Sequence, residues 1–139
     1  MTGRTYLDWN ASAPLRPEAR AAMIAAMDVV GNPSSVHSEG RKSRAIVERA
    51  RAQIKAAFGA GSADVVFTSG ATEAAALALA GRGLACSDSE HDCVHVWCAD
   101  RLATDVDGPN SAVQFANSET GMVQDLPDDL AVCDFVQGF

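Results

Sequence analysis

The segment that most constrains the fold is residues 65–73, Val-Val-Phe-Thr-Ser-Gly-Ala-Thr-Glu. A short β-branched and aromatic run ends there in a small polar turn, and an alanine- and leucine-rich helix begins at once. That order points backbone N–H groups and the positive end of a helix at one place. Ser69 and Thr72 can add hydroxyl donors, and Gly70 allows a close approach of the backbone. The segment therefore predicts a phosphate-binding turn.

Size and composition bound the class of protein. The chain has 139 residues, 47% of them hydrophobic and 21% charged, which predicts one globular domain able to bury a core. The net charge of −7 argues against binding to nucleic acid or to an anionic membrane surface. No run of 18 apolar residues occurs, and the N-terminus lacks the apolar core of a signal peptide. We therefore expect a cytoplasmic location.

The cysteines show no Cys-x-x-Cys pair; they are Cys86, Cys93, Cys98 and Cys133. In a cytosolic setting this pattern disfavours a disulfide framework. Zinc is disfavoured as well, because Cys93 and His95 fall in a strand-like run and no fourth ligand is placed. Buried thiols in strands are the favoured interpretation.

Periodicity and breakers predict an α/β protein with a mostly parallel sheet flanked by helices. Helices are expected over residues 17–30, 38–58 and 71–80. Strands are expected over residues 64–68, 84–86, 94–97, 112–116 and 130–133, with a loop at 101–110. The later apolar runs do not alternate, which favours strands buried on both faces.

Polar residues follow several of the expected strands. Thr68 to Thr72 come first, then Glu90 and His91, Asn117 to Glu119, and finally Asp134 and Gln137. In a parallel sheet these groups would converge at the carboxyl edge, where ligands bind. Each has a simpler interpretation as a helix cap, a surface histidine, a turn or a solvated carboxylate. Their joint order favours one site.

The same residues resemble the N-terminal half of the cysteine desulfurases, the NifS- and IscS-like enzymes of the class V aminotransferase group. The motifs that carry the likeness are residues 6–14, 31–37, 67–73, 90–91, 116–121 and 134–137. The resemblance implies fold type I and pyridoxal 5′-phosphate as cofactor. It also implies an N-terminal extended segment over residues 1–15 and part of the cofactor-binding large domain over 16–139.

The resemblance assigns six cofactor residues: Ala71 and Thr72 to the phosphate, His91 to ring stacking and proton transfer, Asn117 and Gln137 to the phenolic oxygen, and Asp134 to the pyridine nitrogen. A carboxylate beside that nitrogen keeps it protonated, so the ring can act as an electron sink. The implied reaction converts L-cysteine to L-alanine. Sulfur passes through an enzyme persulfide to an acceptor protein, for iron–sulfur cluster assembly or tRNA thiolation, in a homodimer.

The family's Schiff-base lysine lies beyond the aspartate–glutamine motif, and neither Lys42 nor Lys55 matches it. The persulfide cysteine also has no counterpart here. We therefore expect a C-terminal half in trans or removed, and an isolated chain that is inactive. The alternatives are a non-catalytic module that binds a phosphate ligand or a partner, and an enzyme like selenocysteine lyase.

Overall fold

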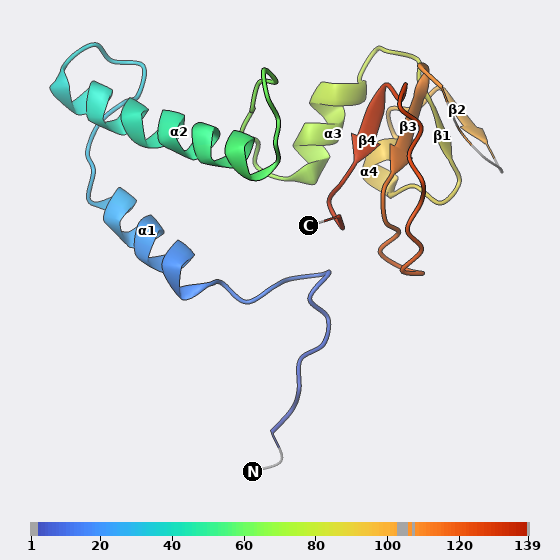
Figure 1. Cartoon of the computed structure of the whole chain (residues 1–139), viewed down its shortest axis with the longest axis horizontal. Coiled ribbons are helices and arrows are strands. Elements are labelled where there is room, and N and C mark those ends of the chain that lie inside the picture. Colours follow the sequence, from blue (N-terminus) through green and yellow to red (C-terminus); the bar gives the residue numbers. More distant parts are fainter. Residues whose placement is uncertain (1–2, 103–105, 107, 139) are drawn as a thin grey trace. The chain divides into compact units, whose positions relative to one another are not determined.

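The computed structural model describes residues 3–102, 106 and 108–138. The chain divides into two compact units, Met1–Val66 and Phe67–Phe139. The first unit contains helices α1 (Pro17–Met27) and α2 (Ser38–Ala57). The second contains helix α3 (Ala71–Leu79), strand β1 (Ala85–Ser87), helix α4 (Asp92–His95) and strands β2 (Asp100–Leu102), β3 (Ser111–Gln114) and β4 (Val132–Asp134) (Figure 1).

Helix α1 begins at a proline and ends earlier than expected. Pro17 occupies the first turn, where its missing N–H costs nothing, and Glu18 adds a favourable charge at the positive end. The helix stops at Met27, so the expected extension to residue 30 is wrong. The last expected positions hold Val29 and Val30 before a glycine, and β-branched residues are poor at continuing a helix.

Helix α2 begins where the Gly-Asn-Pro-Ser-Ser loop folds back on it. The His37 imidazole caps the helix by accepting from the Gly40 N–H at 3.4 Å. A Cβ added to Gly40 would overlap the carbonyl oxygens of Asn32 and Ser35. A glycine is therefore needed for the loop to approach the helix so closely.

The second unit is built on a four-stranded sheet in the order β2-β1-β3-β4, and all three pairings are parallel. Ala112 lies beside Val132 and Gln114 beside Asp134. All four residues of β3 are buried, as expected for an inner strand covered on both faces. The expected α/β class with a parallel sheet and flanking helices is confirmed.

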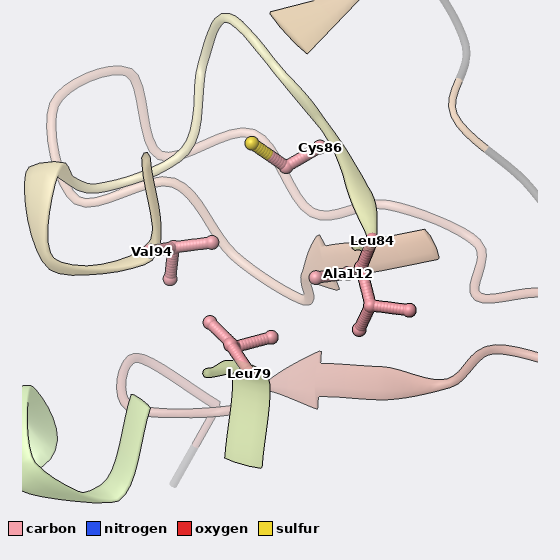
Figure 2. Close-up of a cluster of buried hydrophobic side chains, with 5 residues drawn as sticks. All are labelled: Leu79, Leu84, Cys86, Val94 and Ala112. Atoms are coloured by element: carbon pink, nitrogen blue, oxygen red, sulfur yellow. The ribbon is translucent and has the colours of Figure 1, made fainter. Parts of the chain in front are cut away.

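The core joins both helices of this unit to the sheet (Figure 2). Its buried members are Leu79 of α3, Leu84 and Cys86 at β1, Val94 of α4 and Ala112 of β3. In Figure 2 the Leu79 and Val94 side chains point toward each other beside the sheet residues. Burying each large aliphatic side chain contributes ~1.5–3 kcal/mol, so this cluster fixes α3 and α4 against the strands.

Two of the expected elements are wrong, and a third is wrong at its start. Residues 64–68 form no strand, because no described strand pairs with them; the Val65 carbonyl instead accepts from the Arg51 side chain at 3.1 Å. Residues 94–97 begin inside helix α4, so Cys93 and His95 are helical. The expected loop at 101–110 begins within strand β2, and its residues 103–105 and 107 lie outside the described part.

The thiols follow the expectation only in part. Cys86 is buried in β1, but Cys133 in β4 is exposed and Cys93 and Cys98 are intermediate. Burial, followed by the neighbouring Cys98, raises the pKa of the Cys86 thiol to about 12. The described residues contain no cluster of three or more potential metal ligands. Within the same residues, every helix is too short or too polar to cross a bilayer.

Candidate functional site

The carboxyl ends of the parallel strands carry most of the sequence-predicted site. β1 leads to Glu90 and His91, β3 leads to Asn117, and β4 ends at Asp134. A stacked pair of rings, Phe115 and Phe135, joins the segments that follow β3 and β4, with ring centroids 4.3 Å apart. Parallel strands end at one edge of the sheet, so these segments share that edge.

A cavity of about 250 Å³ lies between α3 and the sheet. Alanines of α3 form one wall, and residues of β3 and β4 form the other. Most of its lining is apolar. The carboxyl groups that line it belong to Glu90 and Asp134, and Ala71, in the first turn of α3, lines it as well. A small ligand with an apolar body and a cationic or hydrogen-bonding group matches this chemistry.

The predicted phosphate turn begins helix α3. Ser69 donates to Glu73 Oε2 through its backbone N–H at 2.6 Å and its hydroxyl at 2.7 Å. These bonds lower the pKa of Glu73, the backbone N–H of Ser69 having the largest effect. The N-cap Gly70 offers no side chain to the first turn. Ala71 and Thr72 therefore stand at a positive helix end that no side-chain cap closes.

His91 is exposed and caps helix α4. Its Nδ1 accepts from the Cys93 N–H at 3.1 Å and lies 3.0 Å from the Cys93 sulfur. A neutral imidazole that accepts at Nδ1 carries its proton on Nε2. The Nε2–H edge is thus the one that can donate or transfer a proton.

Asn117 organises its own loop. Its Oδ1 accepts from the backbone N–H groups of Glu119 at 2.9 Å and Thr120 at 2.8 Å, and from the Thr120 hydroxyl at 3.1 Å. Its Nδ2 donates to the Ser89 carbonyl at 3.0 Å. The amide is therefore positioned by both the loop and the turn before His91.

Asp134 is the last residue of β4. Its Oδ1 accepts from the Val136 N–H at 2.9 Å, which turns the chain back after the strand. The carboxyl group also lines the cavity. Gln137 follows in the next turn, where it is partly buried.

Glu90, which precedes His91, was expected only as part of a motif and is a buried member of the site. It is 5% exposed, and its Oε1 accepts from the Gln114 N–H at 2.9 Å. Its Oε2 has no hydrogen-bond partner in the described part of the chain. Burial raises the pKa of this carboxyl, and Asp134 raises it further, against the lowering effect of the Gln114 N–H.

Of the six predicted cofactor residues, the structure brings Ala71 and Asp134 to one cavity. The others lie outside its lining: Thr72, His91, Asn117 and Gln137. The sequence interpretation missed Gln114, a buried polar residue inside an apolar run. A lone amide in the middle of such a run is the available signal, because buried polar groups are kept only with partners.

Comparison with known proteins adds the family to this geometry. The aminotransferase class-V model matches residues 5–104. The chain belongs to this family. The match includes the α3 turn and the Glu90–His91 pair and confirms the resemblance to the class V aminotransferase group; the motifs at 116–121 and 134–137 lie beyond it.

Among curated relatives, the cysteine desulfurase IscS of Dictyoglomus turgidum is 43% identical over 88 residues, 63% of this chain and 22% of that protein. The IscS-like cysteine desulfurase of Mycobacterium tuberculosis is 42% identical over 85 residues, 61% and 22% of the two chains. Human selenocysteine lyase is 45% identical over 71 residues, 50% and 16%. The matched segment thus spans about a fifth of these relatives. No solved structure matches the chain significantly.

Proposed function

We propose that this class V aminotransferase chain supplies the first cofactor-binding part of a pyridoxal-phosphate-dependent cysteine desulfurase. The observation that carries the proposal is that Ala71, at the open end of α3, and Asp134, at the end of β4, line one cavity. One offers helix N–H groups for a phosphate, and the other offers a carboxylate for a protonated ring nitrogen. These two kinds of group match the phosphate and the ring nitrogen of a phosphorylated pyridine.

The residues fit the cofactor by chemistry. Pyridoxal phosphate supplies an electron sink when its ring nitrogen is protonated. Ala71 and Thr72 would hold its phosphate at the α3 end, Asp134 its ring nitrogen, and Asn117 and Gln137 its phenolic oxygen. The apolar wall of α3 would exclude water and so strengthen the pairing of Asp134 with a cation.

His91 is proposed as the catalytic residue that stacks on the ring and transfers protons. Its Nδ1 is occupied by the Cys93 N–H, so a proton can be held or released at Nε2. The Schiff-base lysine and the persulfide cysteine would come from a further segment. We propose L-cysteine as substrate, an acceptor protein for the sulfur, a homodimer and a cytoplasmic setting for the completed enzyme.

A second candidate is a selenocysteine lyase, favoured by the 45% identity to the human enzyme of that name. Both candidates use the same cofactor site, and no described residue distinguishes sulfur from selenium. A third is a non-catalytic module that binds a phosphate ligand. It is favoured by the Asn117 amide, whose oxygen already accepts three hydrogen bonds within its loop.

The test is equilibrium binding of pyridoxal phosphate to the full chain, followed by its absorbance. Asp134→Ala removes a charge-assisted pair worth ~1.5–3 kcal/mol, so affinity should fall about 10- to 150-fold. The matched control is Asp125→Ala, at an exposed carboxyl outside the cavity, which should leave the affinity unchanged. Equal affinities for the wild type and Asp134→Ala would remove Asp134 from the site.

A further inference from the structure

Gln114, the last residue of β3, bonds to a turn that is distant in sequence. It is 5% exposed. Its backbone N–H donates to Glu90 Oε1 at 2.9 Å, across 24 positions of sequence. Its side-chain Nε2 donates to the Ser89 carbonyl at 2.6 Å and to the Ser89 hydroxyl at 3.2 Å. One buried residue thus uses both main chain and side chain to hold the turn that leads to His91.

The Ser89 carbonyl is the meeting point of three segments. Besides Gln114 Nε2, it accepts from Asn117 Nδ2 at 3.0 Å. The turn before His91, the end of β3 and the Asn117 loop therefore share one acceptor. We name these residues, Ser89, Glu90, Gln114 and Asn117, the amide clasp.

The clasp also connects to the strand that carries Asp134. Gln114 lies beside Asp134 in the β3–β4 register. The Gln114 carbonyl accepts from Gln124 Nε2 at 3.0 Å, which closes the far end of the Asn117 loop. Gln114 therefore connects the segments of three proposed cofactor-facing residues: the turn before His91, the loop of Asn117 and the strand that ends at Asp134.

Packing alone does not explain an amide here. The preceding β3 residues Ala112 and Val113 are apolar and buried, and an apolar side chain at position 114 would lose no hydration. A buried amide is retained only if its donors are satisfied, and those of Gln114 are directed to the turn before His91. The effect that distinguishes the Gln114 amide from an apolar side chain is therefore that it positions the turn before His91.

We propose that Gln114 is a positioning residue, which through Ser89 and Glu90 sets the turn of His91 against the loop of Asn117. The proposal rests on the proposed function for the identity of the ligand, since both positioned residues would face the ring of pyridoxal phosphate. Gln114 does not line the cavity, and its bonds go to Ser89 and Glu90. It acts on the ring side of the site alone.

The experiment compares Gln114→Met with Gln124→Met in the full chain. Each variant loses one side-chain amide donated to a backbone carbonyl, but Gln124 makes no bond to Ser89. We expect Gln114→Met to weaken pyridoxal phosphate binding about 2- to 10-fold, the net size of one hydrogen bond. Binding of inorganic phosphate should be unchanged in both variants, because the α3 turn is untouched. Equal loss of both ligands in Gln114→Met would mean general damage and overturn the proposal.

A second measurement needs no cofactor. In Gln114→Met, hydrogen exchange of the Asn117 side-chain amide and of the Glu119 and Thr120 N–H groups should accelerate more than in Gln124→Met. Equal exchange in the two variants would overturn the proposal. In the wild type, a scalar coupling across the hydrogen bond from Gln114 Nε2 to the Ser89 carbonyl is expected. Absence of this coupling would overturn the proposal, whether or not the variants fold. Failure of the wild type to bind pyridoxal phosphate would instead overturn the proposed function, with the exchange result still deciding the role of Gln114.

Discussion

At the residue scale, the carboxyl group of Glu90 is both a hydrogen-bond acceptor and buried, and these two features have opposite effects on its pKa. Its Oε1 is needed to accept from the Gln114 N–H, yet its carboxyl is almost fully removed from water. Burial disfavours the charged form, and the nearby Asp134 adds like-charge repulsion. His95 and the Gln114 N–H act in the other direction but do not cancel the effect of burial. The site therefore holds a carboxyl that gains a proton more easily than one in water.

This gives a prediction for the pH dependence of stability. The folded pKa of Glu90 lies above its ordinary value of 4.5. The folded state therefore holds the proton more tightly than the unfolded state, and the contribution of Glu90 to the free energy of unfolding falls as pH rises from about 4.5 through its folded pKa. Glu90→Gln cannot lose a proton at this position. As pH rises over this range, the free energy of unfolding of Glu90→Gln should therefore increase relative to that of the wild type. Urea titrations from pH 4 upward measure the difference, with Glu119→Gln as the exposed control. Parallel curves for wild type and Glu90→Gln would show that burial does not perturb Glu90.

How far the sequence predicts the site differs from residue to residue. Local pattern alone predicts Asp134 at a strand end and Ala71 at a helix start, and the structure has both there. The burial of Glu90 and the amide clasp could not be predicted, because they depend on bonds between residues 24 to 28 positions apart. Periodicity describes neighbours in sequence and does not predict hydrogen bonds between residues so far apart.

At the element scale, the errors have a common physical cause. The apolar run at 94–97 fits a short buried strand or a short buried helix equally well by pattern. The His91 cap and the packing of Val94 into the core selected the helix. The run at 64–68 has the composition of a strand, but a strand exists only through a partner's hydrogen bonds. The parallel sense of the sheet, by contrast, follows from the alternation of helices with short apolar runs, although strand β2 falls where a loop is expected.

The start of helix α2 supports a prediction of its own. Gly40→Ala should gain ~1 kcal/mol from helix propensity, but its Cβ would meet two backbone carbonyls that cannot move without opening the loop. Overpacking of this kind costs ~1–3 kcal/mol, so we expect net destabilisation of the loop and of the first turn of α2. Hydrogen exchange at Arg41, whose N–H donates to the His37 carbonyl at 3.0 Å, measures it. Slower exchange than in the wild type would contradict the close approach.

At the scale of the whole molecule, buried residues are distributed unevenly. The buried hydrophobic cluster lies wholly within the second unit. In the described part of the first unit, Gly40 is the only buried residue, and large apolar side chains such as Met27, Val30 and Val36 are exposed. Local stability follows buried apolar contact. The second unit should therefore resist local unfolding more strongly than the first.

The final prediction tests this division with two leucines of one helix. Leu79 is 1% exposed and belongs to the core, whereas Leu77, in the same helix, is 66% exposed. Leu79→Ala should cost ~2–5 kcal/mol by the lost burial and the space left behind, while Leu77→Ala should change stability by less than ~0.5 kcal/mol. Hydrogen exchange of β3 amides should accelerate in Leu79→Ala alone, with α2 amides unchanged in both variants. Acceleration of α2 to the same extent as β3 would mean that the two units unfold together, and the core around Leu79 would then stabilise the whole chain.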